Sequence, residues 1–575
     1  PSRIMLLCYN HNAAMSLRRR LTELLGRDGA RVSVFTFHGL AMSLTGNAVQ
    51  NRTSDDIDFT TIIDDAIKLL RGEQNQLGLE LEEQREKLLG GLQFLLVDEY
   101  QDIDEQQYQL IAALVGKSEE DEEARLHLMA VGDDDQSIYA FRDANVSFIR
   151  RFEQDYNAQT HFLTWNYRST AHIIETSNRL IEHNQDRMKR THPIEIDDRR
   201  KMEVAGGHWE GMETAQGRVI IQQCQDAAQQ AAEVVRHIAL IREKTPTCPL
   251  ESIAVLARNG LEKEELAWVR SALADADIPC RFTLDKENGF PVHRCREILR
   301  YQNWLQQQGH ALLTAEQLAA PLPPLSLANR WEELLHDLIA QWQASQGEHA
   351  LSAHHFLMFL YEYLSEQKRQ IRFGKGVLLS TVHGVKGEEY RHVILLDGGW
   401  QRAAELSTSN LEEERRLFYV GMTRAIERLV LMARHDQRNP HIPLIASHCY
   451  VQRPNATRPD RQRRFAMMGM SQLVLGYAGH SDEGQTIHNE LRALKVGDAV
   501  RIAPDKQDRL HVYHRSHKIA RLSLQGEETW KFDVNTIREA RVIALVERRK
   551  EQEKDEYQPK MRSERWEIPI IELEL

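Results

Sequence analysis

Short apolar runs alternate with amphipathic stretches along the first 160 residues. Residues 3–9 and 32–37 are apolar enough to predict buried strands, and residues 10–25 between them place Ala and Leu at helical spacing. Further strands are predicted at 95–97 and 126–131. Strands that alternate with helices in this way indicate an α/β fold with a parallel sheet.

The same alternation returns later in the chain, on both sides of a stretch of different character. Residues 285–370 are rich in Leu, Gln and His and predict an inserted helical domain. Short alternating runs at 494–530 predict a small β domain. The strands predicted in the alternating parts are 161–165, 219–221, 253–256, 377–382, 393–396 and 429–432, with a helix over 412–425.

Two carboxylates, Asp98 and Glu99, directly follow the apolar run 95–97. Open parallel sheets place their chemistry at the carboxyl ends of strands. An acid there can hold Mg²⁺, which prefers oxygen ligands, and an adjacent acid can take a proton from an attacking water. This is the layout of the second phosphate-site motif of nucleoside triphosphatases.

The charge balance excludes a uniformly basic protein. The chain has 73 basic and 85 acidic residues, a net charge of −12, so any DNA contact must lie in a groove with its own basic lining. The six cysteines form no CxxC pair, which argues against a zinc or iron–sulfur site and fits a cytoplasmic protein. No apolar run reaches the length of a membrane span, so no membrane partner is expected.

Four further segments complete the pattern: the loop GDDDQSIYAFR at 132–142, NYRS at 166–169, HGVKGEEY at 383–390 and EERRLFYVGMTRA at 413–425. In this order, the motifs between about residues 3 and 435 resemble the superfamily 1A DNA helicases of the UvrD/Rep/PcrA type. The resemblance implies two RecA-like P-loop NTPase motor domains, with ATP between them and single-stranded DNA across their top.

The resemblance also implies the residues of each site. At the ATP site, Asp98 corresponds to the acid that holds Mg²⁺ and Glu99 to the acid that activates water. The other matches there are Gln136 as γ-phosphate sensor, Tyr167 as the aromatic on adenine, Arg168 and Arg424 as arginines that reach the γ-phosphate, Glu389 as the acid near the ribose, and Arg142 as the link between the two sites. The DNA positions are Tyr9, Thr36, His38, Phe141 and His383.

The domains expected from the resemblance divide the chain into six parts. These are motor domain 1A at 1–160 with a short 1B-like insertion at about 46–92, motor domain 2A at 161–284 and 371–450, a helical 2B-like insertion at 285–370, a linker at 451–490, and a small C-terminal β domain at 491–575. The β domain weakly resembles modules that bind DNA ends or partner proteins. His511, His514 and His517 within it are predicted to be surface residues, because His511 and His514 would face opposite sides of a strand.

The chain departs from the family in identifiable places. The phosphate loop GxxxxGK[ST] is absent, and the family places that loop just before the strand that begins here at Arg3, so the chain is expected to start just after it. The first DNA motif reads CYNHNAA where the family has threonines and a lysine, Ala140 replaces a glycine, and Glu388 replaces an apolar residue.

The expected function is an ATP-dependent helicase or translocase on single-stranded DNA or DNA with a single-stranded tail. The family indicates 3′→5′ movement in repair, recombination or replication restart, and the β domain offers a surface for a protein partner. The alternative is a catalytically incomplete motor remnant that binds DNA or a partner without turnover. A phosphate loop directly upstream would distinguish the two. A helicase–nuclease fusion is disfavoured, because the C-terminal part shows no cluster of metal-binding acids.

Overall fold

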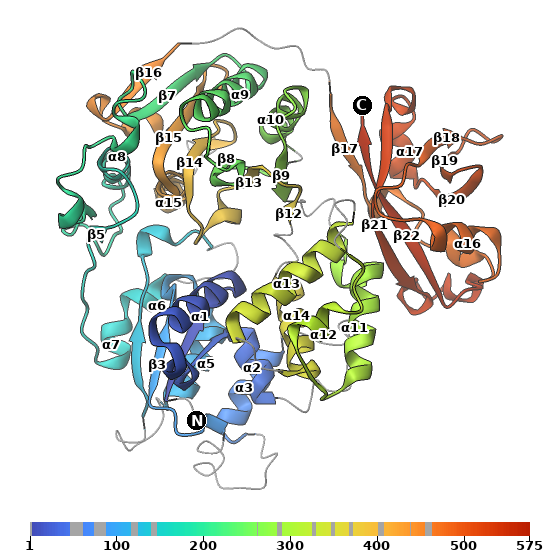
Figure 1. Cartoon of the computed structure of the whole chain (residues 1–575), viewed down its shortest axis with the longest axis horizontal. Helices are drawn as coiled ribbons and strands as arrows, with labels where there is room; N and C mark the ends of the chain where they lie inside the picture. The colour runs from blue at the N-terminus through green and yellow to red at the C-terminus, as the bar shows by residue number, and fades with distance from the viewer. Residues whose placement is uncertain are drawn as a thin grey trace. The chain divides into compact units, whose positions relative to one another are not determined.

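The computed structural model describes residues 3–45, 61–73, 88–116, 125–139, 146–261, 263–283, 290–324, 329–346, 351–366, 372–400, 408–437, 439–454 and 463–575. They form two compact units, each of which mixes helices and strands (Figure 1). Unit 1 comprises Pro1–Gly260 and Lys375–Pro459, and unit 2 comprises Leu261–Gly374 and Asp460–Leu575. Within the described ranges, no helix has the length and apolar character needed to cross a membrane.

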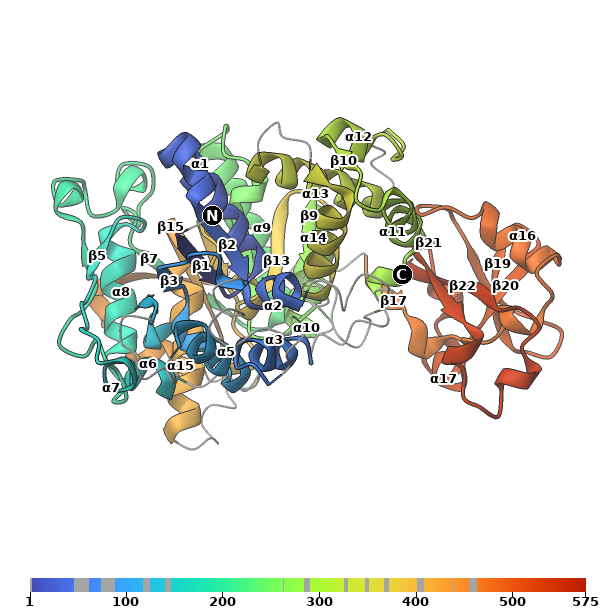
Figure 2. The ribbon, with the colours of Figure 1, turned by 90° about the horizontal axis from the view of Figure 1, so that it is seen from below.

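The first sheet of unit 1 is parallel and has the strand order β2-β1-β3-β4. Its strands are β1 (Ile4–Cys8), β2 (Val32–Thr36), β3 (Phe94–Val97) and β4 (His127–Ala130). Helix α1 (His11–Leu25) covers one face and α5 (Glu105–Val115) the other, as Figure 2 shows. The Asn10 side chain caps α1 by accepting a hydrogen bond from the backbone N–H of Ala13, at 2.8 Å.

Smaller helices complete this part of unit 1. They are α2 (Phe37–Thr45), α3 (Ile62–Leu70), α6 (Ser147–Arg150) and α7 (Phe152–Tyr156). Of the predicted insertion at 46–92, α3 and residues 88–92 are described, whereas residues 46–60 and 74–87 lie outside the described part.

Strand β4 lies at the end of the first sheet, and among the described residues no strand pairs with its outer edge. Two apolar side chains near this edge face solvent, since Met129 is 55% exposed and Val131 41%. A cavity of about 950 Å³ runs along β4 and reaches Asp98 and Glu99. The open edge and the acidic end of β3 therefore share one hollow.

The second sheet of unit 1 is also parallel, in the order β13-β8-β14-β15-β7-β16. Its strands are β7 (Val219–Cys224), β8 (Ile253–Ala257), β13 (Val377–Thr381), β14 (Tyr390–Leu395), β15 (Ala425–Arg434) and β16 (Tyr450–Arg453). Every residue of β8 is buried, as expected for a parallel strand that is covered on both faces. Helices α8 (Ala171–Ile181) and α15 (Thr408–Thr423) contribute to the core on one face, and α9 (Ala227–Lys244) packs against β7 and β15.

Three sequence predictions for this part need correction. The strand predicted at 161–165 is reduced to β5 (Trp165–Asn166), which pairs with β6 (Glu195–Ile196). The helix predicted at 412–425 ends at Thr423, so Arg424 lies in the turn before β15. The range predicted as a linker, 451–490, contains strand β17 (Phe465–Met468) and the beginning of helix α16 (Thr486–Ala493), both of unit 2.

Unit 2 combines helices with antiparallel sheets. Its helices are α10 (Glu264–Asp275), α11 (Arg296–Gln308), α12 (Ala315–Ala319), α13 (Arg330–Gln346), α14 (Ala353–Glu366), α16 and α17 (Leu524–Trp530). Two short strand pairs lie among the helices: β9 (Cys280–Thr283) with β12 (Arg372–Phe373), and β10 (Leu312–Leu313) with β11 (Leu351–Ser352). The C-terminal strands are β18 (Arg501–Pro504), β19 (Leu510–His514), β20 (His517–Arg521), β21 (Glu539–Arg549) and β22 (Arg565–Glu574). They form two three-stranded sheets, in the orders β17-β22-β21 and β18-β19-β20.

The helical stretch and the C-terminal strands are tied together within unit 2 by a buried arginine. Arg296 at the start of α11 donates two hydrogen bonds to the Glu567 carboxylate on β22, both at 2.5 Å. It also donates to the backbone carbonyl of Leu494 at 2.5 Å. The segments predicted as a separate insertion and a separate β domain thus belong to one compact unit, while the predicted boundaries themselves stay predictions.

The three histidines predicted to lie at the surface, His511, His514 and His517, do not all do so. His511 is 3% exposed and His514 7%, and only His517 is exposed. The pairing of β19 with β20 shifts register between Val512 and Tyr513, and such an irregularity breaks the strict alternation on which the surface prediction rested. That prediction is therefore wrong for His511 and His514.

Candidate functional site

The acidic end of β3 is the first component of the site. Asp98 extends the ladder, its N–H donating to the Leu7 carbonyl at 2.9 Å, and its carboxylate accepts the N–H of Glu99 at 3.0 Å. Burial, followed by the charge of Glu99, raises the pKa of Asp98. Glu99 itself adopts a left-handed conformation, with φ 53°. Two crowded carboxylates and a strained backbone are typical of a site that receives a cation.

A glutamine and a glycine connect this strand end to the loop after β4. The Gln101 side chain donates to Glu99 Oε2 at 2.5 Å and accepts the backbone N–H of Asp133 at 2.9 Å. A Cβ on Gly132 would lie 2.5 Å from the Gln101 side-chain oxygen and 3.2 Å from the Tyr100 backbone nitrogen, so a side chain at this position would displace the Gln101 amide from its present contacts. Glycine at 132 therefore permits the close approach that aligns the loop with the acids.

Gln136 is held from both sides. Its amide nitrogen donates to Asp133 at 2.9 Å, and its amide oxygen accepts from the Arg424 guanidinium at 3.1 Å. Its backbone carbonyl accepts from Lys386 at 2.5 Å, and Lys386 also pairs with Asp102. One residue of the first sheet's loop is thus linked to two segments of the second sheet.

Two arginines lie close together opposite the acids. Arg424 is 2% exposed, and burial, followed by the charge of Arg168, lowers its pKa. Arg168 pairs with Glu389, yet its Nε is buried and has no hydrogen-bond partner among the described residues. Neighbouring guanidiniums, one with an unsatisfied donor, form a site suited to an anion with several oxygens. Tyr167 next to them is 63% exposed.

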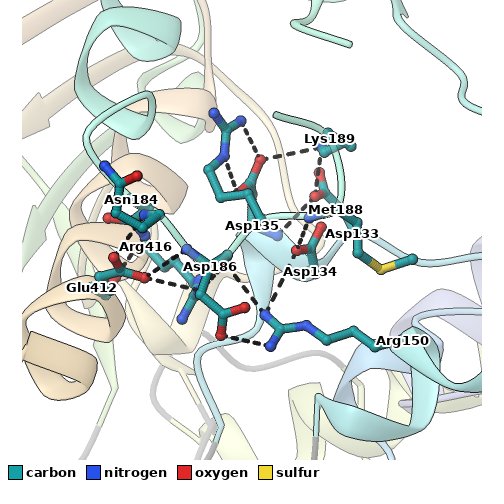
Figure 3. A network of polar contacts seen from close by, with 12 residues as sticks. Asp133, Asp134, Asp135, Arg150, Asn184, Asp186, Met188, Lys189, Glu412 and Arg416 are labelled. Atoms are coloured by element: carbon teal, nitrogen blue, oxygen red, sulfur yellow. Dashed lines mark hydrogen bonds and ion pairs between the residues drawn. The ribbon is translucent and has the colours of Figure 1, made fainter. Parts of the chain in front are cut away.

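A network of ion pairs anchors the Gln136 loop (Figure 3). Arg187 donates to both oxygens of Asp135, at 2.7 and 2.6 Å, and Lys189 lies 2.6 Å from Asp133. The backbone N–H of Gln185 donates at 2.7 Å to Glu412 on α15. Residues 184–189 therefore connect the loop to the helix that leads to Arg424.

Sequence reasoning did not single out these residues or the pair of Lys386 and Asp102. The three consecutive aspartates at 133–135 were a visible signal, because buried carboxylates require cationic partners. Arg150 lies 16 positions from Asp134, but Arg187 lies 52 positions from Asp135 and Lys189 lies 56 positions from Asp133, and no local pattern indicates these longer distances.

The predicted DNA positions are only partly brought together. The Tyr9 and Tyr139 rings stack at 5.4 Å, and the Tyr139 hydroxyl donates to the His383 carbonyl at 3.1 Å. Tyr139 is 4% exposed and belongs to the buried core around the second sheet. Thr36 is buried and its hydroxyl accepts the N–H of Gly39 at 3.1 Å.

The other DNA-side positions give less information. His38 is half-buried at the start of α2. Phe141 and Arg142 lie outside the described residues, so their roles stay predictions.

Two protein-family models match most of unit 1 and part of unit 2. The UvrD/REP helicase N-terminal domain matches residues 47–157, and the UvrD-like helicase C-terminal domain matches residues 161–319 and 326–436. The chain belongs to the UvrD/REP helicase family.

Curated members of the UvrD/REP family are similar over much of the chain. DNA helicase II of Escherichia coli is 26% identical over 483 residues, which cover 72% of this chain and 65% of that protein. The putative ATP-dependent DNA helicase YjcD of Bacillus subtilis is 24% identical over 60% of this chain and 52% of its own length. ATP-dependent DNA helicase PcrA of Staphylococcus epidermidis is 34% identical over 29% of this chain and 21% of its own. The chain thus spans less than two thirds of the length of these UvrD/REP relatives.

Proposed function

We propose that this chain forms the ATP-hydrolysing, DNA-translocating part of a DNA helicase. The position of Gln136 supports the proposal most directly. Its side chain accepts a hydrogen bond from Arg424, and its loop is connected to Glu99 by hydrogen bonds of the Gln101 side chain. Acids, a sensing amide and paired arginines thereby meet across two parallel sheets of unit 1. The proposed architecture is two RecA-like motor domains, one around each sheet, with residues 285–370 as a helical insertion.

The residues present fit a nucleoside triphosphate with Mg²⁺. The raised pKa of Asp98 reflects burial and the neighbouring carboxylate of Glu99, and a divalent cation would relieve both effects. The unsatisfied Nε of Arg168 fits a phosphate oxygen in the same way. Asp98 would hold Mg²⁺, which supplies charge neutralisation to the phosphoryl group when bound.

Each side chain of the proposed ATP site then has its own role in binding or hydrolysis. Glu99, held at one oxygen by Gln101, accepts a proton from water. Gln136 orients that water, and Arg168 and Arg424 stabilise the negative charge that grows in the transition state. Tyr167, whose ring is exposed, stacks on the base, and Glu389 lies by the ribose.

The proposed substrate is single-stranded DNA or DNA with a single-stranded tail, moved 3′→5′. Tyr9 and His383, which contact the Tyr139 ring from different sheets, belong to the proposed DNA path together with Thr36, His38 and Phe141. Aromatic side chains stack on bases without reading their sequence. A partner protein at the C-terminal strands and a role in DNA repair complete the proposal.

The decisive experiment is Arg424→Ala in the full-length protein. An arginine that acts on transition-state charge affects turnover far more than nucleotide affinity. By analogy with arginine fingers, the ATPase rate should fall about 10³-fold or more. ATP affinity and single-strand affinity, measured on the same preparation, should change little.

Arg391→Ala is the matched control, because Arg391 pairs with Glu427 at the surface of the same sheet. Its ATPase rate should equal that of the wild type. An unchanged rate in Arg424→Ala would refute the proposed role of this arginine. Loss of DNA binding together with turnover would show that Arg424 is structural, and absence of ATPase from the full-length wild type would favour a binding module.

A further inference from the structure

A cluster of three potential metal ligands lies in unit 1 apart from the site described above. It consists of Glu175 on α8 and two residues of a short 3₁₀ helix before β16, His448 and Cys449. One ligand atom from each residue lies within 4.8 Å of the other two. None of the three has a role in the proposed ATP or DNA site.

The distances within the cluster match tetrahedral coordination. His448 Nε2 lies 3.0 Å from Glu175 Oε1 and 3.5 Å from Cys449 Sγ. Bonds of about 2.3 Å to sulfur and about 2.0 Å to nitrogen and oxygen, at tetrahedral angles, separate the ligand atoms by about 3.5 Å for S···N and about 3.3 Å for N···O. The side chains are therefore already close to a coordinating arrangement.

The environment suits a cation that enters from solvent. The side chains of His448 and Glu175 are 60% and 45% exposed, whereas Cys449 is 1% exposed beneath them. Thiolate and carboxylate together carry two negative charges, which balance a divalent ion. Sulfur, imidazole and carboxylate ligands in one site select borderline metals such as Zn²⁺ over Mg²⁺ or Ca²⁺.

We propose that Glu175, His448 and Cys449 form a binding site for one Zn²⁺-class ion, with water as the fourth ligand. Coordination replaces the S–H bond of Cys449 by an S–metal bond and releases one proton to solvent, with no change of oxidation state. The bound ion would join α8 to the segment that leads into β16, the last strand of its sheet.

The other dense cluster of carboxylates, Asp133 to Asp135, does not carry a similar inference. Arg187 already contacts both oxygens of Asp135, and Lys189 contacts Asp133. Cations of the chain itself therefore occupy the positions that a metal would need.

The test is a Co²⁺ titration of the metal-free chain 1–575 under reducing conditions, because Co²⁺ substitutes for Zn²⁺ and reports thiolate ligation by charge-transfer absorption. One equivalent should produce the thiolate band, and Zn²⁺ should abolish it by displacement. Cys449→Ser should remove the band. Cys248→Ser is the matched control, because the Cys248 thiol is also buried but contacts Ser252 at 3.0 Å instead of a potential ligand.

Two further variants keep the test valid if Cys449→Ser fails to fold. His448→Ala and Glu175→Gln alter exposed side chains, and each should weaken Co²⁺ binding by at least the 10- to 100-fold typical of groups that support metal ligands. Zn²⁺ should also raise the unfolding temperature of the wild type but not of Cys449→Ser. Absence of the band in the wild type, or an identical band in Cys449→Ser, would overturn the proposal.

Discussion

Lys189 offers a direct test of the network that anchors the Gln136 loop. Its ammonium lies 2.6 Å from Asp133 and 3.7 Å from Asp135, and its side chain is 13% exposed. Burial opposes ionisation of Asp133, but the ion pair with Lys189 keeps the pKa of this carboxyl below its usual range. Lys189→Met keeps most of the length of the side chain and removes the ammonium with its charge and its N–H donors.

The expected loss follows from the burial of the pair. Removing one partner of a buried ion pair costs about 3–5 kcal/mol, because the other charge is left without compensation. Since 19% of the Asp133 side chain is exposed, water screens part of the effect and the lower end, about 3 kcal/mol, applies. Adding Asp133→Asn removes the orphaned charge, so the double variant should recover much of the loss.

Amide hydrogen exchange of the chain 1–575 is the suitable assay, because it resolves unit 1 from unit 2. A loss of about 3 kcal/mol of local stability raises the rate of amide exchange through local opening about 100-fold. The faster exchange should be found mainly in residues 184–189 and α15. Lys201→Met is the control, because Lys201 pairs with Asp198 at the surface, where both side chains are half-exposed. Exchange no faster in Lys189→Met than in Lys201→Met would refute the reasoning.

Three further predictions concern the chain as it stands. Without a glycine-lysine phosphate loop, residues 1–575 alone should show little DNA-stimulated ATPase, because backbone N–H groups and the lysine of that loop supply much of the triphosphate affinity; a robust rate would contradict this. Phe141→Ala should weaken single-strand binding by about 1–3 kcal/mol, measured by fluorescence anisotropy, and unchanged affinity would make Phe141 a core aromatic. Burial, followed by the charge of Arg428, lowers the pKa of His392 to about 3, so the folded state binds fewer protons than the unfolded state below about pH 6.5 and stability falls as pH drops. Protonation of His392 in the unfolded state should therefore lower the free energy of unfolding by about 2 kcal/mol at pH 5 relative to pH 8. In urea unfolding, His392→Phe should lose less stability between these two pH values than the wild type, and an equal loss in both proteins would argue against this role of His392.

The sequence predicted the sheets well, because the strands of unit 1 are short and continuously apolar. The predicted runs at 3–9 and 253–256 correspond to β1 and β8, both covered by helices on their sheets. The strand predicted at 161–165 was mostly wrong, because an apolar run forms a strand only where a neighbouring strand pairs with it. Leu163 in this run is 83% exposed. Periodicity also extended the last helix through Arg424, whereas the backbone turns there so that the guanidinium meets Gln136.

The contacts of the candidate site were less predictable than its residue types. Carboxylates after a strand and an arginine after a helix can be recognised locally, but a contact such as the one between Gln136 and Arg424 cannot be read from either segment alone. The ion pairs of Arg187 and Lys189 join segments that are distant in sequence, and charge patterning cannot select one aspartate among the 85 acidic residues. The cluster at His448 and Cys449 was missed for the same reason, since Glu175 is 273 positions away from His448.

The open edge of β4 is a surface for self-association, and it lies beside the cavity that reaches Asp98 and Glu99. An unpaired strand edge is a template for another strand, and its solvent-facing Met129 and Val131 make association more favourable. Concentrated preparations of this chain are therefore expected to aggregate through β4 unless that edge is capped. The cavity beside β4 extends to Asp98 and Glu99, so a strand added at this edge would lie beside the same cavity that reaches the two acids. Protection from aggregation and access to the acids are thus controlled at the same edge.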